Sequence, residues 1–305
     1  MVAKSLRTKK SNSVGVLVED VLAFSTPHII NGISEYMEST DYHILLNDLR
    51  MLDSLYNQYD QIIHQKEKIQ KELLYLVYGA KVDAVIYVGM FDRDISGIIS
   101  NIDKPVIVAY STSKDDHTCF VTYENEDIST QIVRYLLDAG HRQIAVITGL
   151  AHTPPAQLRL KGIHRAFDDA GITLDSNLVK NGNWERESGY ACMKELLDDN
   201  NKIAMPTAVF AMNDLMAIGA MDAIRDAGLS VPQDISVVGF DNREVSDFVL
   251  PKLTTAEIDL KTIGFTAAQM AAEKLAGSGQ YIQERRVIIP SHMILRNSVC
   301  KKIGT

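Results

Sequence analysis

The stretch "FAMNDLMAIGAMDAIRDAGLSVPQDISVVGFDN", residues 210–242, decides the fold. It begins and ends with short apolar runs of the kind that buried parallel strands give. Between the runs, residues Asp214–Asp226 have helical periodicity, and Gly228 stands where a helix C-cap adopts the left-handed conformation. The stretch therefore predicts a βαβ unit in which Asp241 ends the second strand.

The same alternation extends through the chain on both sides of this unit. The first half carries apolar runs of strand length at Ser13–Val18, Tyr42–Leu46, Asp83–Gly89 and Lys104–Tyr110. A second series starts near Phe120 and continues at Gln143–Gly149, with helices expected at about Glu126–Ala139, Gln157–Ala170 and Arg186–Asp198. We expect the strands to be buried and parallel, in two α/β sheets of similar size. Residues 58–81 are charge-rich and helical in period, which indicates a solvated helix face without chemistry.

Composition limits the class of protein. The chain has 305 residues, 46% of them hydrophobic, and a net charge of -8, which suits a globular protein of two domains. It has no apolar run long enough for a membrane helix, and its N-terminus does not have the pattern of a secretory signal. We therefore expect a cytoplasmic protein. The three cysteines lie far apart and the eight histidines show no metal-ligand spacing, so neither a metal nor a cofactor is expected.

Enzyme motifs are absent from the sequence. It has no GxSxG elbow, no GxGxxG turn and no complete phosphate loop. Carboxylates such as Asp20 and Asp241 could face one another as a glycosidase pair does, but no companion motif supports that chemistry. We therefore predict a binding protein and not an enzyme.

Six segments together resemble the LacI/GalR family of bacterial transcription regulators. In the family's order and spacing they are "VAKSLRTKKSNSVGVLV", "LLDAGHRQIAVITG", "RLKGIHRAFDDAGI", residues 210–242, "KLTTAEIDLKTIG" and "IPSHMILRNS". The resemblance implies two similar Rossmann-like parallel-sheet subdomains of the periplasmic-binding-protein-like type I fold, joined by three crossovers near Val121, Asp241–Glu257 and Val287. It places residues 13–121 and 258–287 in the first subdomain, 122–257 and 288–299 in the second, a hinge remnant at 1–12 and a tail at 300–305.

The basic start of the chain resembles the end of the family's hinge helix, which follows a helix-turn-helix domain. The resemblance therefore implies a regulator core without its DNA-reading domain, through which operator DNA would be bound. By this resemblance Leu6 would wedge into the minor groove of operator DNA, with Val2 and Ala3 on the same face. Lys4 and Arg7 would add phosphate contacts. A hinge this short does not hold a helix by itself, so a frayed tail is the alternative.

In the family, a small-molecule effector lies between the subdomains at the carboxyl ends of the strands. Asp241 and Arg159 match the pair that binds neighbouring sugar hydroxyls, and Asn213 suits a third. Trp184, the only tryptophan, matches an aromatic residue that stacks on the ligand. Further candidates are Phe24, Ser25 and Tyr110, which depart from the family pattern, and Phe91, Leu260 and Ile258. The alternatives are a surface arginine at Arg159, turn chemistry at Asp241 and a core tryptophan.

Ile218, Met221, Phe248 and Val249 match positions used for dimer packing, and they suit a core equally well. The resemblance thus predicts the effector-binding and dimerising core of a regulator, most often a repressor, in which effector binding alters the hold on DNA. Arg159, Asp241 and Trp184 favour a sugar over a nucleobase as effector. A periplasmic sugar-binding receptor of a transport system is the alternative function, since such receptors share this fold.

Overall fold

The computed structural model describes residues 11–51, 65–99, 102–116, 118–198, 205–277 and 286–302. The chain divides into two compact units, each made from two separate parts of the sequence. Unit 1 comprises Met1–Tyr123 and Asp259–Ile289, and unit 2 comprises Glu124–Ile258 and Pro290–Thr305. The expected hinge residues, Val2, Ala3, Lys4, Leu6 and Arg7, lie outside the described residues.

Unit 1 is built on a parallel sheet of six strands in the order β11-β5-β4-β3-β1-β2. The strands are β1 (Ser13–Val18), β2 (His43–Asp48), β3 (Ala84–Val88), β4 (Val106–Ala109), β5 (Cys119–Tyr123) and β11 (Arg286–Ile289). The two units divide two residues beyond the first and third expected crossovers, because β5 and β11 pair as far as Tyr123 and Ile289. Ile258, expected in the first subdomain, lies in unit 2.

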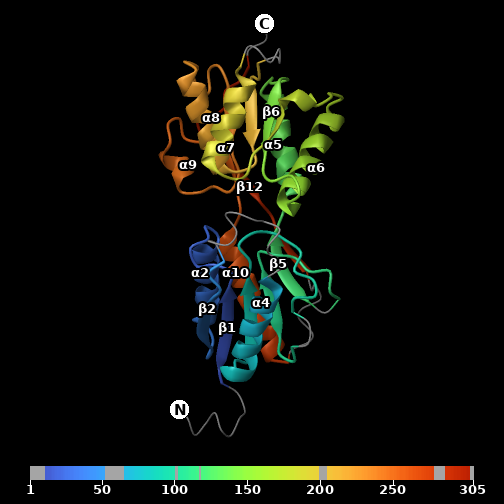
Figure 1. The fold of residues 1–305 in the computed structure, drawn as a ribbon, viewed down its shortest axis with the longest axis vertical. Helices are drawn as coiled ribbons and strands as arrows, with labels where there is room; N and C mark the ends of the chain where they lie inside the picture. Colours follow the sequence, from blue (N-terminus) through green and yellow to red (C-terminus); the bar gives the residue numbers. More distant parts are fainter. Residues whose placement is uncertain are drawn as a thin grey trace. The chain divides into compact units, whose positions relative to one another are not determined.

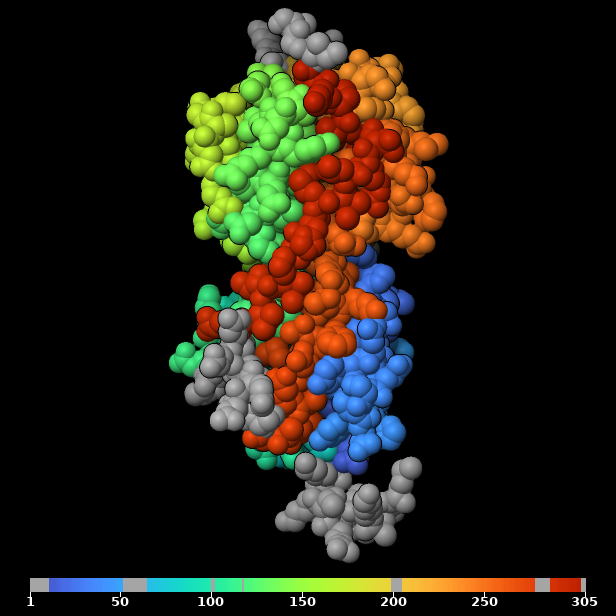
Figure 2. Space-filling model, turned by 180° about the vertical axis from the view of Figure 1, so that it is seen from behind, coloured from blue at the N-terminus to red at the C-terminus, as the bar shows by residue number. Residues whose placement is uncertain are grey.

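Helices α2 (Thr26–Met37) and α10 (Leu260–Leu275) pack side by side on unit 1, although more than 200 residues separate them (Figure 2). Their backbones touch at two glycines. A Cβ at Gly264 would overlap the carbonyl oxygen of Ile29, and one at Gly32 would overlap the carbonyl oxygen of Lys261. The close approach therefore requires glycine at both positions.

The helical segment after β2 corrects one expectation. Residues 52–64 lie outside the described part of the chain, and α4 (Lys66–Leu74) is followed by a π-helical turn at Tyr75–Gly79. The segment is not simply solvated, because Ile69, Leu73 and Leu76 are fully buried in the core under β3 and β4. Its polar residues occupy only the outer face of an amphipathic helix.

β2 was expected to be a buried strand, and this was wrong. It is the edge strand of the sheet, and Leu45 and Leu46 are 40% and 45% exposed. Successive side chains of a strand point to opposite faces, so β2 presents apolar groups on both. The apolar sequence of β2 resembles that of the central strands, which is why composition alone did not reveal its position.

Unit 2 has a parallel sheet of four strands in the order β7-β6-β8-β9. These strands are β6 (Ile144–Thr148), β7 (Val179–Asn181), β8 (Ala208–Ala211) and β9 (Ser236–Val238), and β10 (Thr255–Glu257) and β12 (His292–Ile294) form a separate antiparallel pair. The helices are α5 (Glu126–Asp138), α6 (Pro154–Asp169), α7 (Arg186–Leu196), α8 (Asp214–Asp226) and the short α9 (Val245–Phe248). α5 packs on α6 and α7 packs on α8 (Figure 1).

The βαβ unit at 210–242 has the predicted form, with α8 spanning Asp214–Asp226 and Gly228 at a φ of +76°. α6 starts at Pro154, earlier than the expected Gln157. Two prolines occupy its first positions, where backbone donors have no partner within the helix. In the part of the chain that the structure describes, no helix is long and apolar enough to cross a membrane.

We predict that Gly264→Ala destabilises unit 1 by about 1 to 3 kcal/mol, because a methyl group cannot enter the α2–α10 contact without moving the helices. Helix propensity alone would give the opposite sign by about 1 kcal/mol. Urea unfolding measures the change. Gln269→Ala, on the exposed face of the same helix, is the control and should change stability by no more than about 0.5 kcal/mol. A Gly264→Ala protein as stable as the parent would contradict the packing argument.

Candidate functional site

The carboxyl ends of β6, β8 and β9 bring the main candidates of unit 2 together. Gly149 follows β6, Asn213 follows β8 and Asp241 follows β9, and parallel strands place these ends at one edge of the sheet. Arg159 reaches the same edge from α6 and Trp184 from the loop before α7.

Arg159 is buried at this edge and is not a surface arginine. Its Nε donates to Asn125 Oδ1 at 2.9 Å, and its Nη1 donates to the carbonyl of Met212. The guanidinium carbon lies 3.5 Å from the ring centroid of Phe240 and 5.6 Å from that of Trp184. These contacts fix the plane of the guanidinium and offset part of the cost of burying its charge.

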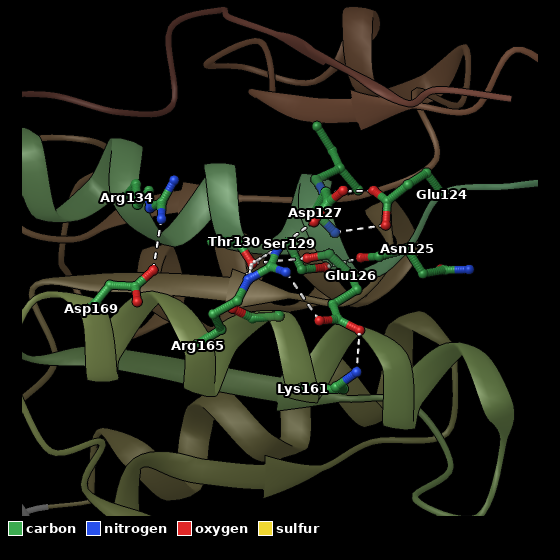
Figure 3. Close-up of polar contacts among 12 residues, drawn as sticks. Glu124, Asn125, Glu126, Asp127, Ser129, Thr130, Arg134, Lys161, Arg165 and Asp169 are labelled. Atoms are coloured by element: carbon green, nitrogen blue, oxygen red, sulfur yellow. Dashed lines mark hydrogen bonds and ion pairs between the residues drawn. The ribbon is translucent and has the colours of Figure 1, made fainter. Parts of the chain in front are cut away.

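The packing of α5 on α6 positions Asn125 and Arg159, since Asn125 precedes α5 and Arg159 lies within α6. A Cβ at Gly162 would overlap the carbonyl oxygen of Glu126, so the helices approach closely there. Arg165 bridges them with ion pairs to Glu126 at 3.1 Å and Asp127 at 2.5 Å (Figure 3). This outer cluster is largely exposed, so its ion pairs add little stability individually, while the glycine contact sets the spacing.

Asp241 stands on strained backbone with a φ of +110°, and its N–H donates to the carbonyl of Ala256 at 2.8 Å. One carboxylate oxygen lies 3.9 Å from Arg159 Nη2 and the other 3.4 Å from Arg243 Nε. Burial raises the pKa of Asp241, and the two guanidinium groups oppose the rise. The turn at Asp241 thus presents an acceptor between two fixed cations.

Trp184 packs its indole ring on Gly149, where any side chain would overlap the ring atoms. Its own φ is +77°, and its carbonyl accepts a hydrogen bond of 2.7 Å from Asn213 Nδ2. The ring is only half-buried, so it is not a core tryptophan. A planar, partly exposed surface therefore lies beside the Arg159 guanidinium.

Asn213 has a structural role, in helix capping and in holding a neighbouring loop, that was not predicted from the sequence. Its Oδ1 accepts the N–H of Met216 at 2.8 Å and so caps α8, while its Nδ2 holds the Trp184 backbone. Asparagine is a favoured N-cap residue for this reason. The amide links the site to the start of a helix in addition to any contact with a ligand.

Asp214 is a further polar group that sequence reasoning missed. It is fully buried, with Oδ1 accepting the Thr255 hydroxyl at 2.6 Å and Oδ2 accepting the N–H of Arg243 at 2.7 Å. Burial, followed by repulsion from Asp241, raises the pKa of Asp214 to about 7. Asn125, Phe240 and Arg243 were also missed. Phe240 and Arg243 lie within two residues of Asp241, which was the available signal.

The unit 1 candidates were Phe24, Ser25, Phe91, Tyr110 and Leu260, with Ile258 now in unit 2. Tyr110 has a φ of +61° and stacks on Tyr123 with centroids 5.1 Å apart. Ser25 is buried and donates to the carbonyl of Met90 at 3.3 Å. Phe24 and Phe91 are half-buried, whereas Leu260 and Ile258 are almost fully buried.

A buried polar cluster at the carboxyl end of β1 was also not predicted from the sequence. Glu19 pairs with Arg93 and accepts the Tyr87 hydroxyl, and its second oxygen accepts the N–H of Met90 at 2.8 Å. Burial raises the pKa of Tyr87 well above its usual value, and the Glu19 charge adds to the rise. The cluster fixes the loop after β3, which carries Phe91. Within the described residues, no group of three His, Cys, Asp or Glu side chains is placed to hold a metal ion.

Residues 133–299 match the family of periplasmic binding protein-like domains. The chain belongs to this family, in its LacI/GalR branch. It is 29% identical to the HTH-type transcriptional repressor PurR of Pasteurella multocida, over 99% of this chain and 85% of the relative. A LacI-family transcriptional regulator from Rhizobium etli has a TM-score of 0.80 at 24% identity, over 95% of this chain and 100% of that one.

A third relative is the lac repressor dimer, solved with operator and the anti-inducer ONPF. Its TM-score is 0.77 at 24% identity, and 98% of each chain is covered. All three of these relatives are transcription regulators. They therefore favour a regulator over the transport receptor that the sequence left open.

We predict that Gly149→Ala shifts the fluorescence of Trp184 to longer wavelength, because the added methyl group displaces the indole towards solvent. Trp184 is the only tryptophan, so emission reports this ring alone. Gly228→Ala is the control, since its Cβ would meet open space and its φ of +76° tests backbone strain without touching the site. Unchanged emission in Gly149→Ala would show that the ring does not pack on this strand end.

Proposed function

We propose that this LacI/GalR chain binds a small-molecule effector at the carboxyl edge of the unit 2 sheet and is the effector-binding core of a transcriptional repressor. The observation that carries the proposal is the buried Arg159 guanidinium held beside Asp241 and the half-buried ring of Trp184. Buried charges in fixed geometry at a strand end suit recognition of a polar ligand.

A sugar matches these groups in chemistry. The Asp241 carboxylate accepts hydrogen bonds from two hydroxyls, and the planar guanidinium of Arg159 donates in a fixed direction. The Trp184 ring offers an apolar face to the C–H side of a pyranose. Asn213 adds an amide, and we propose Phe24, Ser25, Phe91, Tyr110, Ile258 and Leu260 as the further contacts that select among sugars.

Regulation requires that the effector binds two states of the protein with different affinity, and a coupling of about 1 to 3 kcal/mol is typical. We propose that operator DNA is read by an N-terminal helix-turn-helix domain of the kind that the family carries. The basic N-terminal segment of this chain would add phosphate contacts, which weaken with salt. Effector binding would raise or lower the affinity for operator DNA, and that change in affinity would be the regulatory response.

A second copy of this chain is the proposed protein partner, as in the lac repressor dimer. Among the four residues predicted to pack there, Phe248 on α9 is 71% exposed and Val249 is half-buried. Leu250, which follows, is 87% exposed and extends the apolar surface. Ile218 and Met221 of α8 are almost fully buried within the unit, which favours the core alternative for these two residues.

We predict that a monosaccharide or disaccharide raises the melting temperature by several degrees at a hundredfold excess over its dissociation constant, which corresponds to about 2.7 kcal/mol. Asp241→Asn and Arg159→Lys should each weaken binding at least tenfold, or about 1.4 kcal/mol. Calorimetric titration measures both.

Asp169→Asn is the matched control, since this exposed carboxylate on α6 pairs only with the surface residue Arg134 in the described ion pairs. It should bind the same sugar with unchanged affinity. Stabilisation by purines and by no sugar would refute the ligand class. Full affinity in both site variants would refute the site.

We predict that Phe248→Asp converts a dimer into a monomer in sedimentation velocity at micromolar concentration, because the change places a charge in the proposed apolar contact. Met205→Asp is the control, since Met205 is an exposed apolar residue of unit 2 outside this surface. A Phe248→Asp protein that sediments like its parent would place the contact elsewhere.

A further inference from the structure

Asp214 and Asp241 lie on consecutive strand ends and share one neighbour. Arg243 donates its backbone N–H to Asp214 Oδ2 at 2.7 Å, while its side-chain Nε lies 3.4 Å from Asp241 Oδ2. The backbone N–H of Asp214 donates to the carbonyl of Phe240 at 2.8 Å, so the first turn of α8 is tied to the residue before Asp241. No side chain fits at Gly239, where a Cβ would overlap Asp214 Oδ1. The two carboxyl groups therefore have little freedom to separate.

The charges around this pair come from four elements. Arg159 faces Asp241 from α6, and Arg243 faces both acids from the loop after β9. The backbone of Glu257 in β10 forms a β-bridge with that of Asp241, and the Glu257 carboxylate accepts a hydrogen bond of 3.0 Å from Asn242 Nδ2. Arg296, which follows β12, donates to Asn242 Oδ1 at 2.7 Å. Asp214 itself accepts only neutral donors in the described hydrogen bonds, the Thr255 hydroxyl and the Arg243 N–H.

We propose that Asp214 and Asp241 share a single proton near neutral pH, so that Asp214 sets the charge of the candidate site. The proton belongs to the pair as a unit, because both carboxyl groups are buried, both contact Arg243, and buried carboxyl groups that repel one another titrate together. Asp241 has two guanidinium neighbours and keeps its charge more readily. Asp214 takes the proton, and the 2.6 Å contact with the Thr255 hydroxyl remains a hydrogen bond with either group as donor.

The position of the titration follows from burial. Desolvation and repulsion by Asp241 raise the pKa of Asp214 to about 7, against lowering by the Thr255 and Arg243 hydrogen bonds. The two acids and two arginines then carry one net positive charge below neutrality and none above it. Insofar as the proposed function holds, the site becomes more attractive to acidic sugars and sugar phosphates as the pH falls.

The experiment uses Trp184 as an internal reporter and needs no ligand. Its ring lies 5.6 Å from the Arg159 guanidinium, which in turn neighbours Asp241, and it is the sole tryptophan. We expect its emission to change in one step with a midpoint at about 7 and the step to be absent in Asp214→Asn. Thr255→Val should move the midpoint upwards, because it removes a hydrogen bond that stabilises the ionised carboxylate.

Two histidines serve as controls. His152 lies in the loop after β6, three residues beyond the Gly149 on which the Trp184 ring packs, and His141 is buried between Thr207 and the carbonyl of Cys300 with a pKa lowered by burial. His152→Gln and His141→Gln should keep the step. A step lost in either control and kept in Asp214→Asn would overturn the proposal, as would flat emission in the parent.

The stability of the protein gives a second, independent measurement. A raised pKa means that the folded state holds a proton that the unfolded state has released above pH 3.8, so the stability contribution is full below that value and is lost as the pH rises through about 7. From this group alone the folding equilibrium constant should fall up to tenfold per pH unit across that window. Urea unfolding of Asp214→Asn should lack this part of the slope, and an identical slope in both proteins would overturn the proposal. Neither measurement depends on a sugar, so failure here and failure of the proposed function are distinguishable.

Discussion

The burial of one guanidinium group organises unit 2. Moving the Arg159 charge out of water is costly, and the protein offsets that cost with an amide oxygen, a backbone carbonyl, an aromatic face and a carboxylate. Each of these comes from a different part of the chain. The segment before α5, the end of β8, the end of β9 and the loop after it must all be in place before the charge is satisfied. Removing any one of them leaves a buried cation short of a partner.

Backbone strain gathers at the same edge. Trp184 and Asp241, together with Asn242 at a φ of +50°, all adopt the left-handed region that side chains avoid. In unit 1, Tyr110 at the end of β4 does the same. Strain of this kind persists only when the surroundings determine the conformation. Here the hydrogen bond from Asn213 Nδ2 to the Trp184 carbonyl and the β10 contact of Asp241 supply that support. Among the described residues of unit 2, the positive-φ residues other than glycine all lie at the carboxyl edge of the sheet.

The positions of the helices and strands could be predicted from the sequence better than the burial and the neighbours of their side chains. Strand and helix periods located β1, β3, β6 and α8, because local spacing determines which residues can face a core. The exposure of β2 depends on its place at the sheet edge, which is a property of the whole sheet and leaves no local mark. For the site, Asp241 and Arg159 were found by motif, whereas Asp214 and Glu19 were not. Their environment arises only when residues far apart in the chain meet, as Glu19 and Arg93 do across two strands.

The paired strands β5 and β11 also determine the order in which the protein is assembled. β11 completes the edge of the unit 1 sheet and α10 covers its face, yet both follow the whole βαβ series of unit 2 along the chain. On a ribosome, unit 1 must wait as an incomplete sheet with the α2 face uncovered until residues 259–289 emerge, by which time most of unit 2 is available to fold. Nascent chains are thus exposed to aggregation through unit 1, and the long sequence separation of the α2–α10 contact makes its formation a late and slow event in folding.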